Sequence, residues 1–388
     1  MRRQRSVVQM LRAFTPSAAR TARPTVVRAV AAASRGNAAP AQASNVVDSV
    51  NVNGGTVYPV ALRTPVQQYA NVDGGRIDDG RYTDFRADVT KLVPQERVYT
   101  DPVKTFAYGT DASFYRLLPQ VVVKVHNEKE VGEILPMAAK HEAPVTFRAA
   151  GTSLSGQAVT DSILLKLSHT GKNFRNYEIK NDGKEITVEP GLILGEVNRL
   201  LAKYKQQNGL DVQYKMGPDP SSIDSCMIGG VVANNSSGMC CGVKQNTYHT
   251  LKDMRIVFVD GTVLDTADPA SRASFLKSHA KLVEGVVNLA SRVQADKQLS
   301  ALITKKHAIK CTTGYSMNAL VDHPVSDPIE IIKRLMIGSE GTLGFVSQAT
   351  YNTVVDHPHK ASAFIVFKDV REACRAAAVL RSETDVDA

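Results

Sequence analysis

The apolar positions of this chain fall into short runs and helically spaced sets that become regular near residue 121. Val121–Val125 predicts a buried strand, and residues 128–141 predict an amphipathic helix because apolar side chains recur there every three or four positions. Residues 144–147 and Ile163–Leu167 predict two further strands. The pattern therefore predicts a β-α-β unit, followed by a loop of small residues and another strand.

The rest of the chain predicts a mixture of strands and helices. Strands are expected at residues 174–179, 185–189, 254–259, 262–264, 344–354 and 361–367. Helices are expected at residues 194–204, 275–296, 329–336 and 370–380, with a further helix running toward His307. Residues 217–242 are rich in Pro, Ser, Gly, Ala and Asn and predict a long polar loop of the kind found at ligand sites. Residues 45–110 show no regular period and predict an extended arm.

Three segments far apart in the sequence combine glycine with very little charge: residues 148–157, 228–238 and 338–344. Each offers backbone N–H groups rather than acidic side chains, and glycine lets a ligand approach the main chain closely. One such segment is equally consistent with an ordinary tight turn. Together the three predict a site for a bulky flat ring or a diphosphate.

The first segment joins two predicted strands, which is typical of an anion-binding nest. It is not a P-loop, because Gln157 and Ala158 stand where Lys and Ser or Thr are required. It is not a Rossmann fingerprint either, because three glycines opening a helix are absent. The diphosphate expected here belongs to another cofactor, and FAD is the leading candidate.

The chain has 388 residues, which suffice for two or three domains. Its charge is distributed unevenly along the sequence. The net charge is +9, but residues 1–47 contain eight Arg, no Lys and no acidic residue. That composition predicts a mitochondrial or plastid transit peptide, with a disordered basic tail as the alternative. The remaining 39 basic and 38 acidic residues give no reason to expect nucleic acid. No apolar stretch reaches the ~18 residues of a membrane span.

The five cysteines form neither CxxC pairs nor an even framework, which predicts reduced thiols. For the adjacent Cys240 and Cys241, small residues in a crowded turn are favoured over a redox pair or a cluster ligand. His357 and His359 flank a proline in a linker, so an ordinary loop is favoured over a metal site. No metal-binding set is predicted.

Four motifs in this order resemble the FAD-linked oxidase and dehydrogenase family with the p-cresol methylhydroxylase/vanillyl-alcohol oxidase (PCMH/VAO) fold. The motifs are residues 148–157, residues 217–222 leading into 228–238, residues 313–315, and residues 337–344. Within that family the chain is similar to D-lactate and other D-2-hydroxy-acid dehydrogenases. Residues 318–322 resemble the long subgroup in which an iron–sulfur region follows the flavin part.

The resemblance covers about residues 114–353 and implies an α+β fold with a two-subdomain, PCMH-type FAD-binding domain. The two subdomains are expected at residues 114–185 and 186–353. An irregular N-terminal arm is expected at residues 48–113, after the transit peptide. Residues 354–388 are expected to begin an α+β substrate (cap) domain that is truncated at the end of this sequence.

The resemblance further implies noncovalent FAD, because Thr152 follows Gly151 where covalent members place histidine. Any metal or iron–sulfur cluster is expected in the missing C-terminal part. The residues implied to contact FAD are Arg148, Ala149, Ala150, Gly151, Thr152, Ser153, Gly156, Gln157, Pro218, Asp219, Ser222, Ile228, Gly229, Gly230, Asn234, Ser236, Gly238, Glu340, Gly341 and Val346.

The implied reaction is oxidation of D-lactate or a similar D-2-hydroxy acid to the 2-oxo acid, with hydride transfer to flavin N5. Lys310 and Thr313 are implied to bind the substrate, although Lys310 is equally consistent with a solvated lysine. The catalytic base is expected beyond residue 388, and quinone or cytochrome c is the expected electron acceptor.

Two alternatives remain open, a glycolate dehydrogenase or oxidase and a non-catalytic flavin-binding subunit. The expected location is the mitochondrial matrix or inner membrane, ahead of the plastid.

Overall fold

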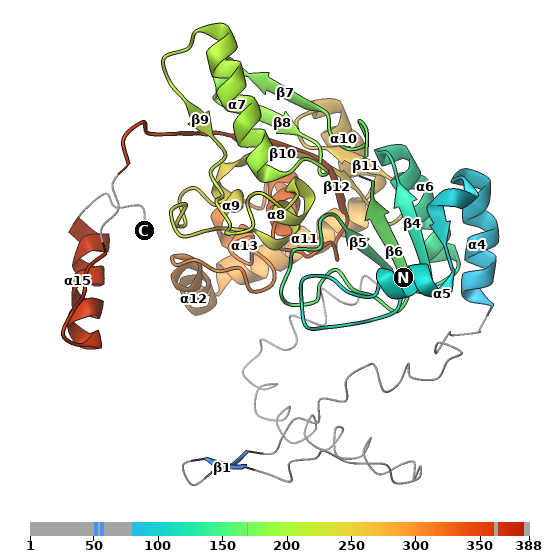
Figure 1. Ribbon diagram of the computed structural model, residues 1–388, viewed down its shortest axis with the longest axis horizontal. Helices are drawn as coiled ribbons and strands as arrows, with labels where there is room; N and C mark the ends of the chain where they lie inside the picture. Colours follow the sequence, from blue (N-terminus) through green and yellow to red (C-terminus); the bar gives the residue numbers. More distant parts are fainter. Residues whose placement is uncertain (1–49, 53–54, 58–79, 169, 361–363, 384–388) are drawn as a thin grey trace. The chain divides into compact units, whose positions relative to one another are not determined.

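The computed structural model describes residues 50–52, 55–57, 80–168, 170–360 and 364–383 (Figure 1). Strands β1 (Val50–Val52) and β2 (Gly55–Val57) pair antiparallel within one compact unit that ends at Arg63. The elements described from residue 80 onward lie in a second unit, Thr64–Ala388. The predicted transit peptide, residues 1–47, lies outside the described residues.

The predicted β-α-β unit is confirmed as part of a four-stranded sheet. Its strands are β3 (Val98–Tyr99), β4 (Val121–Val125), β6 (Ile163–Leu167) and β5 (Val145–Arg148), in that spatial order. β4, β6 and β5 run parallel, while β3 pairs antiparallel with β4 at the edge. Helix α6 (Glu128–Lys140) connects β4 to β5. The loops that follow the three parallel strands therefore leave the same edge of the sheet.

The expectation of an irregular arm is wrong for residues 80–113. This stretch contains α4 (Arg81–Leu92), the short helix η2 (Gln95–Arg97), β3 and α5 (Pro102–Ala107). Phe85, Val89 and Val93 recur every four residues and are fully buried in the core of the first sheet. Three apolar positions in an otherwise polar stretch are a weak periodic signal, and their burial against α6 and the sheet decides the conformation.

A second sheet is antiparallel and has the order β11-β10-β12-β8-β7. Its strands are β7 (Tyr177–Lys180), β8 (Glu185–Val188), β10 (Leu251–Val257), β11 (Val263–Asp265) and β12 (Phe345–Asn352). The expected division of the subdomains at residue 185 is wrong, because a tight turn, η3 (Asn181–Gly183), pairs β7 with β8. The change from the first sheet to the second therefore lies between β6 and β7.

A short ribbon joins β9 (Tyr214–Lys215) to β13 (Val354–Val355). Because β13 pairs with a strand inside the preceding domain, the expected domain boundary after residue 353 falls too early.

Eight helices lie between residues 194 and 336 of the described chain. They are α7 (Leu194–Asn208), α8 (Ile228–Asn234), α9 (Thr247–Thr250), α10 (Pro269–Ser278), α11 (Ala280–Ala295), α12 (Lys297–His307), α13 (Ala319–Asp322) and α14 (Pro328–Met336). Residues 217–242 are not one continuous loop, because α8 forms within them. The helix predicted at 275–296 divides at His279, and the further helix toward His307 is confirmed as α12.

The end of the described chain differs from the prediction of a strand followed by a helix. Helix α15 (Val370–Glu383) is present, but residues 364–367 form no strand. Phe364 is 94% exposed and Val366 is 80% exposed, so these apolar side chains are not part of the core. Among the described helices, none combines the length and the apolar character needed to cross a membrane.

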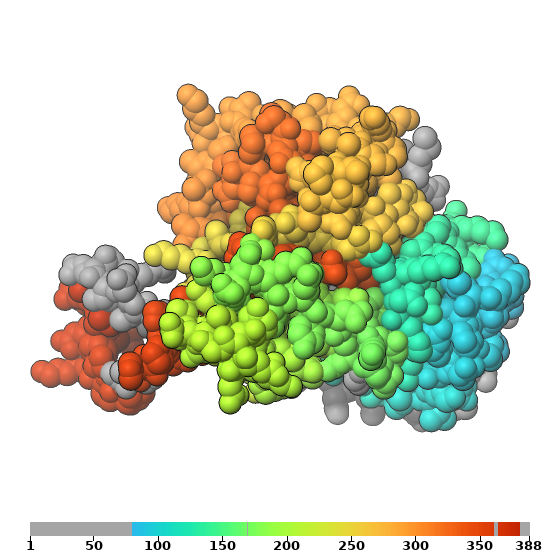
Figure 2. Space-filling view, turned by 90° about the horizontal axis from the view of Figure 1, so that it is seen from above, coloured from blue at the N-terminus to red at the C-terminus, as the bar shows by residue number. Residues whose placement is uncertain are grey.

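Aromatic side chains connect the two sheets. Phe345 of β12 lies 5.2 Å from Phe147 of β5 and 5.8 Å from Phe174 between ring centroids. Phe345 and Val257 from the second sheet belong to the core of the first. The space-filling view shows the first-sheet residues in blue and teal next to the green segment around residue 175 (Figure 2). The α+β prediction is confirmed, with two cores that share this aromatic contact.

The burial of α4 predicts a large stability cost for Phe85→Ala. Phe85 is fully buried and packs edge-on against His141 at 6.3 Å. Removing a buried phenyl group leaves a cavity, so we expect the free energy of unfolding to fall by about 3–5 kcal/mol in urea denaturation. Phe114, which is fully exposed, gives the matched control Phe114→Ala with a change below about 0.5 kcal/mol. Equal effects of the two substitutions would show that α4 is not anchored in the core.

Candidate functional site

The segment 228–238, which begins with α8, is the meeting point of the glycine-bearing motifs. Gly338 N donates to Val232 O at 3.1 Å, and Glu340 N donates to Ala233 O at 2.8 Å. The Lys310 ammonium donates to Ser237 O at 3.1 Å and to Gly238 O at 3.3 Å. Residues 310–315 and 337–344 are therefore both held against the segment 228–238.

A chain of polar side chains connects the 148–157 loop to the same place. The Ser153 hydroxyl bonds the Gln157 side-chain oxygen, and the Gln157 amide donates to the Glu340 carboxylate at 3.3 Å. The Asn234 amide donates to the same carboxylate oxygen at 2.6 Å, and its own oxygen accepts from the Ser236 hydroxyl at 3.2 Å. Five side chains from three separated segments thus form one continuous network centred on Glu340.

Residues 217–222 join the site through Asp219. Its carboxylate accepts from the backbone N–H groups of Gly238, Cys240 and Cys241 at 2.9, 3.0 and 3.1 Å. A Cβ on Gly238 would lie 1.8 Å from the Asp219 carbonyl oxygen, so only glycine fits this approach. All four motifs therefore converge on one region of the fold.

Two cationic side chains hold the base of the first loop. The Arg148 guanidinium donates to the carbonyl oxygens of Ala158, Tyr108 and Thr110, the last two at 2.9 and 3.1 Å. The Lys166 ammonium donates to Ala149 O at 2.6 Å. Burial lowers the pKa of Arg148. The Arg148 side chain thus fixes the loop to its surroundings, and its contact with FAD stays a prediction.

The remaining predicted residues differ in their exposure. Lys310 and Thr313 are exposed, whereas Ile228 and Pro218 are buried and Val346 on β12 is partly buried. Gly230 has no heavy atom within 4 Å of a Cβ built on it, and neither has Gly314. Open space therefore lies beside two glycines of the motifs.

The donors at this place suit a dinucleotide cofactor. The Ser237 hydroxyl is buried and has no hydrogen-bond partner among the described residues. Backbone amides, neutral amide side chains and hydroxyl groups converge here, and such donors hold phosphate and heterocyclic oxygens without a metal. In the ranges that the structure describes, no group of three His, Cys, Asp or Glu could hold a metal ion. The residues present fit FAD.

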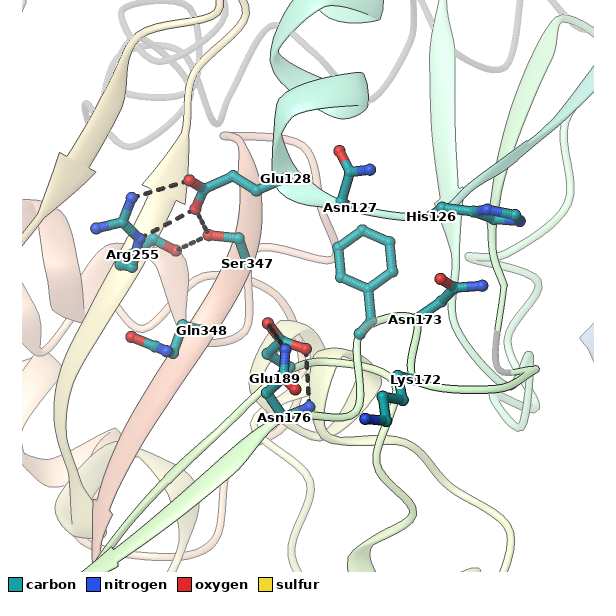
Figure 3. A pocket seen from close by; sticks show the side chains of 11 residues that line it. His126, Asn127, Glu128, Lys172, Asn173, Asn176, Glu189, Arg255, Ser347 and Gln348 are labelled. Carbon is teal, nitrogen blue, oxygen red and sulfur yellow. Dashed lines mark hydrogen bonds and ion pairs between the residues drawn. The ribbon is translucent and has the colours of Figure 1, made fainter. Parts of the chain in front are cut away.

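A further pocket, which the sequence analysis missed, lies where the first sheet meets the second (Figure 3). It measures about 350 Å³ and surrounds Phe174 with polar side chains. On one side the Arg255 guanidinium donates to the Glu128 carboxylate at 2.9 and 3.1 Å, and Ser347 bonds the same carboxylate. This ionic contact ties α6 to β10 and β12. The signal in the sequence was a carboxylate at the start of the helix predicted over residues 128–141.

Comparisons with known proteins point to the same cofactor. The family model described as FAD binding domain matches residues 119–267. The chain is 26% identical over 246 residues to a D-2-hydroxyglutarate dehydrogenase of Escherichia coli, covering 62% of this chain. It is 26% identical over 272 residues to the mitochondrial D-lactate dehydrogenase (cytochrome) 1 of Saccharomyces cerevisiae, covering 68% of this chain. It is 28% identical over 199 residues to glycolate oxidase subunit GlcD of Escherichia coli, covering 50% of this chain.

These matches cover 23%, 34% and 38% of the three relatives, so the chain spans less than two fifths of the length of each. Among solved structures, p-cresol methylhydroxylase with substrate bound superposes with a TM-score of 0.49 at 13% identity. That superposition covers 78% of this chain and 49% of the other.

The environment of Glu340 predicts a pH-dependent stability effect. Burial raises the pKa of Glu340, so its charged form costs stability at neutral pH and the cost is relieved as the pH falls through that raised pKa. We expect Glu340→Gln, which keeps an acceptor for Asn234, to raise the free energy of unfolding at pH 7. The gain should shrink as the pH is lowered toward the ordinary range of a glutamate, in urea denaturations at several pH values.

Glu330 provides a control for which the expected change in stability has the opposite sign. Burial alone would raise the pKa of Glu330, but its contacts with Lys333 and Arg334 lower the pKa overall. Glu330→Gln should therefore reduce stability at pH 7 by about 1–3 kcal/mol, and the loss should fade at acidic pH. The same pH trend for both variants would contradict the assignment of a desolvated charge to Glu340.

Proposed function

We propose that this chain, which matches the FAD binding domain model over residues 119–267 and is similar to FAD-linked dehydrogenases, is the flavin-binding part of an FAD-dependent dehydrogenase. The proposed substrate is D-lactate or a similar D-2-hydroxy acid, which is oxidised to the 2-oxo acid. The named relatives act on D-2-hydroxyglutarate and D-lactate, which supports this substrate class.

The observation that carries the proposal is the convergence of four separated motifs around open space. The 148–157 loop supplies small residues and backbone amides for the diphosphate, as proposed from the sequence. The segment 228–238 supplies Gly230 beside open space and the unpartnered hydroxyl of Ser237. When bound, FAD supplies the acceptor for the hydride from the substrate carbon.

The other residues of the site are proposed to bind and orient the substrate. Lys310 is the one cation of the predicted site residues that reaches segment 228–238, where its ammonium rests on Ser237 O and Gly238 O. An ammonium held in this way can receive the carboxylate of a hydroxy acid, with Thr313 three positions further along. The proton acceptor for the substrate hydroxyl stays unassigned, and we propose that it comes from sequence beyond residue 388.

Two alternatives share the same site. A glycolate dehydrogenase or oxidase is favoured by the similarity to glycolate oxidase subunit GlcD. A non-catalytic flavin-binding subunit is the second alternative, and flavin reduction by substrate distinguishes it from an enzyme. We further propose a mitochondrial location, which the composition of residues 1–47 supports, and quinone or cytochrome c as the electron acceptor. The residues after β13 are proposed as the beginning of a substrate domain.

Gly230→Leu tests the location of the cofactor. Because no atom lies within 4 Å of a Cβ at this position, the substitution should leave the fold intact while filling the space assigned to FAD. We expect the FAD dissociation constant to rise by at least about tenfold, measured by quenching of flavin fluorescence. Gly285→Leu on α11 is the matched control, since Gly285 is also helical with open space around it. If FAD binds both variants equally, the flavin lies elsewhere.

Anaerobic reduction of the flavin tests the reaction. Full-length protein reconstituted with FAD should lose its flavin absorbance on addition of D-lactate or D-2-hydroxyglutarate, and glycolate tests the alternative. Lys310→Gln should raise the substrate concentration for half-maximal bleaching about tenfold, because an ion-assisted hydrogen bond of ~1.5 kcal/mol is lost. Lys305→Gln, on the exposed last turn of α12, is the control. Persistent colour with all three acids would leave the flavin-binding subunit as the function.

A further inference from the structure

Another pocket lies beside the four-stranded sheet and is separate from the four motifs. Its volume is about 510 Å³, which lies in the range of small-molecule sites. Its walls come from the η2–β3 segment, from β4 and β6, and from Tyr108 after α5. None of its lining residues in the described chain belongs to residues 148–157, 217–238, 310–315 or 337–346. The pocket is therefore not the one proposed for FAD.

Three cationic side chains stand in a row on the sheet at this pocket. Lys124 on β4 is in register with Lys166 on β6, and Lys166 is in register with Arg148 on β5. Residues in register on neighbouring strands share one face of a sheet. Lys124 and Lys166 line the pocket. Arg148 does not line it, but its charge acts on the neighbouring Lys166.

The two lysine ammonium groups contact carbonyl oxygens and aromatic rings. The Lys166 ammonium donates to the carbonyl oxygens of Ala149 and Leu167, at 2.6 and 3.0 Å. The Lys124 ammonium lies 5.1 Å from the centre of the Tyr99 ring. Within the described ranges, no ion pair joins either lysine to a carboxylate, whereas nearby Arg97 is paired with Glu130 at 2.9 Å. The protein therefore places two ammonium groups that lack an ion-pair partner in the described ranges at this wall of the pocket, whose lining also includes Glu96.

Two aromatic rings form the wall next to Lys124. Tyr99 and Tyr108 stack with their ring centroids 5.9 Å apart and their planes 14° apart. Both rings are within 6.0 Å of the Lys124 ammonium. This wall limits the orientations of Lys124 and keeps its charge at the pocket.

We propose that this pocket binds a small anion with two or more phosphate or carboxylate groups, held by Lys124 and Lys166. Ammonium groups bind both kinds of oxyanion as point charges, and such an anion supplies the ion-pair partner that both lysines lack in the described ranges. Two ammonium groups on adjacent strands favour an anion of at least two charges over a monovalent one. Lys166 also donates to Ala149 O, so the proposed anion binds next to Ala149 of the 148–157 loop.

Isothermal titration of the full chain with citrate and with inorganic pyrophosphate, at constant ionic strength, tests the proposal. We expect at least one of the two to bind, and Lys124→Gln to weaken that binding by about tenfold or more. Lys124 is only partly buried, so a thermal melt of this variant should show that it is folded. Lys129→Gln on α6, where the side chain is 84% exposed, should bind as the wild type does. Preference for pyrophosphate or for citrate identifies the natural ligand as a phosphate or a carboxylate.

Failure of both anions to bind the wild-type protein overturns the proposal. Binding that is unchanged in Lys124→Gln also overturns it, because the anion then occupies another site, such as the loop proposed for the FAD diphosphate. Neither result bears on FAD, which is measured separately through Gly230.

A pH series on the wild-type protein gives a second test that needs no variant. Burial lowers the pKa of Lys166 to about 8, and the charges of Arg148 and Lys124 add to this effect. The groups around it are Arg148 from β5, Lys124 and His126 from β4, Glu96, Arg97 and Tyr99 from the η2–β3 segment, and Tyr108 after α5. Citrate is fully ionised above neutral pH, so its affinity should fall between about pH 7 and 9 as Lys166 loses its proton. An affinity that stays constant over this range would remove Lys166 from the site.

Discussion

The Glu340 carboxylate is the contact on which the arrangement of the site depends. It accepts hydrogen bonds from Asn234, 106 positions away, and from Gln157, 183 positions away. Its own backbone N–H donates to Ala233 O. Because these three bonds join a loop of the first sheet, a helix beside the second sheet and the turn before β12, they determine how the glycine-bearing segments face one another. Loss of the acceptor oxygen at this position would leave two amide side chains unpaired at the centre of the site.

This arrangement is held at some cost in stability. Glu340 has a φ of 51°, which is unfavourable for a residue with a side chain, and burial raises its pKa. Local strain and desolvated charge are common where a protein positions a ligand. The aromatic contact of Phe345 with Phe147 and Phe174 offsets part of this cost, because it packs the two sheets together a few residues beyond Glu340.

The elements that the sequence predicted well are those with long or strongly apolar patterns. β4, α6, β5 and β6 follow directly from runs such as Val121–Val125, where burial on both faces favours apolar residues and four of the five positions are buried valines. Helix α4 was missed because only Phe85, Val89 and Val93 mark its buried face. Helix α8 was missed because Gly229, Gly230 and Asn234 are typical of loops, although Val231 and Val232 bury against the second sheet.

The sequence by itself determined which segments carry the chemistry, because small residues and glycines at 148–157, 228–238 and 338–344 are distinctive without any neighbour. It also determined β4, α6, β5 and β6 of the first sheet. Only the tertiary structure decided that Glu340 joins these segments, that Arg148 holds a loop, and that Lys124 and Lys166 share a pocket without an ion-pair partner in the described ranges. Local patterns report the burial of one face at a time, whereas contacts across 100 or more positions arise only when strands pair and helices pack.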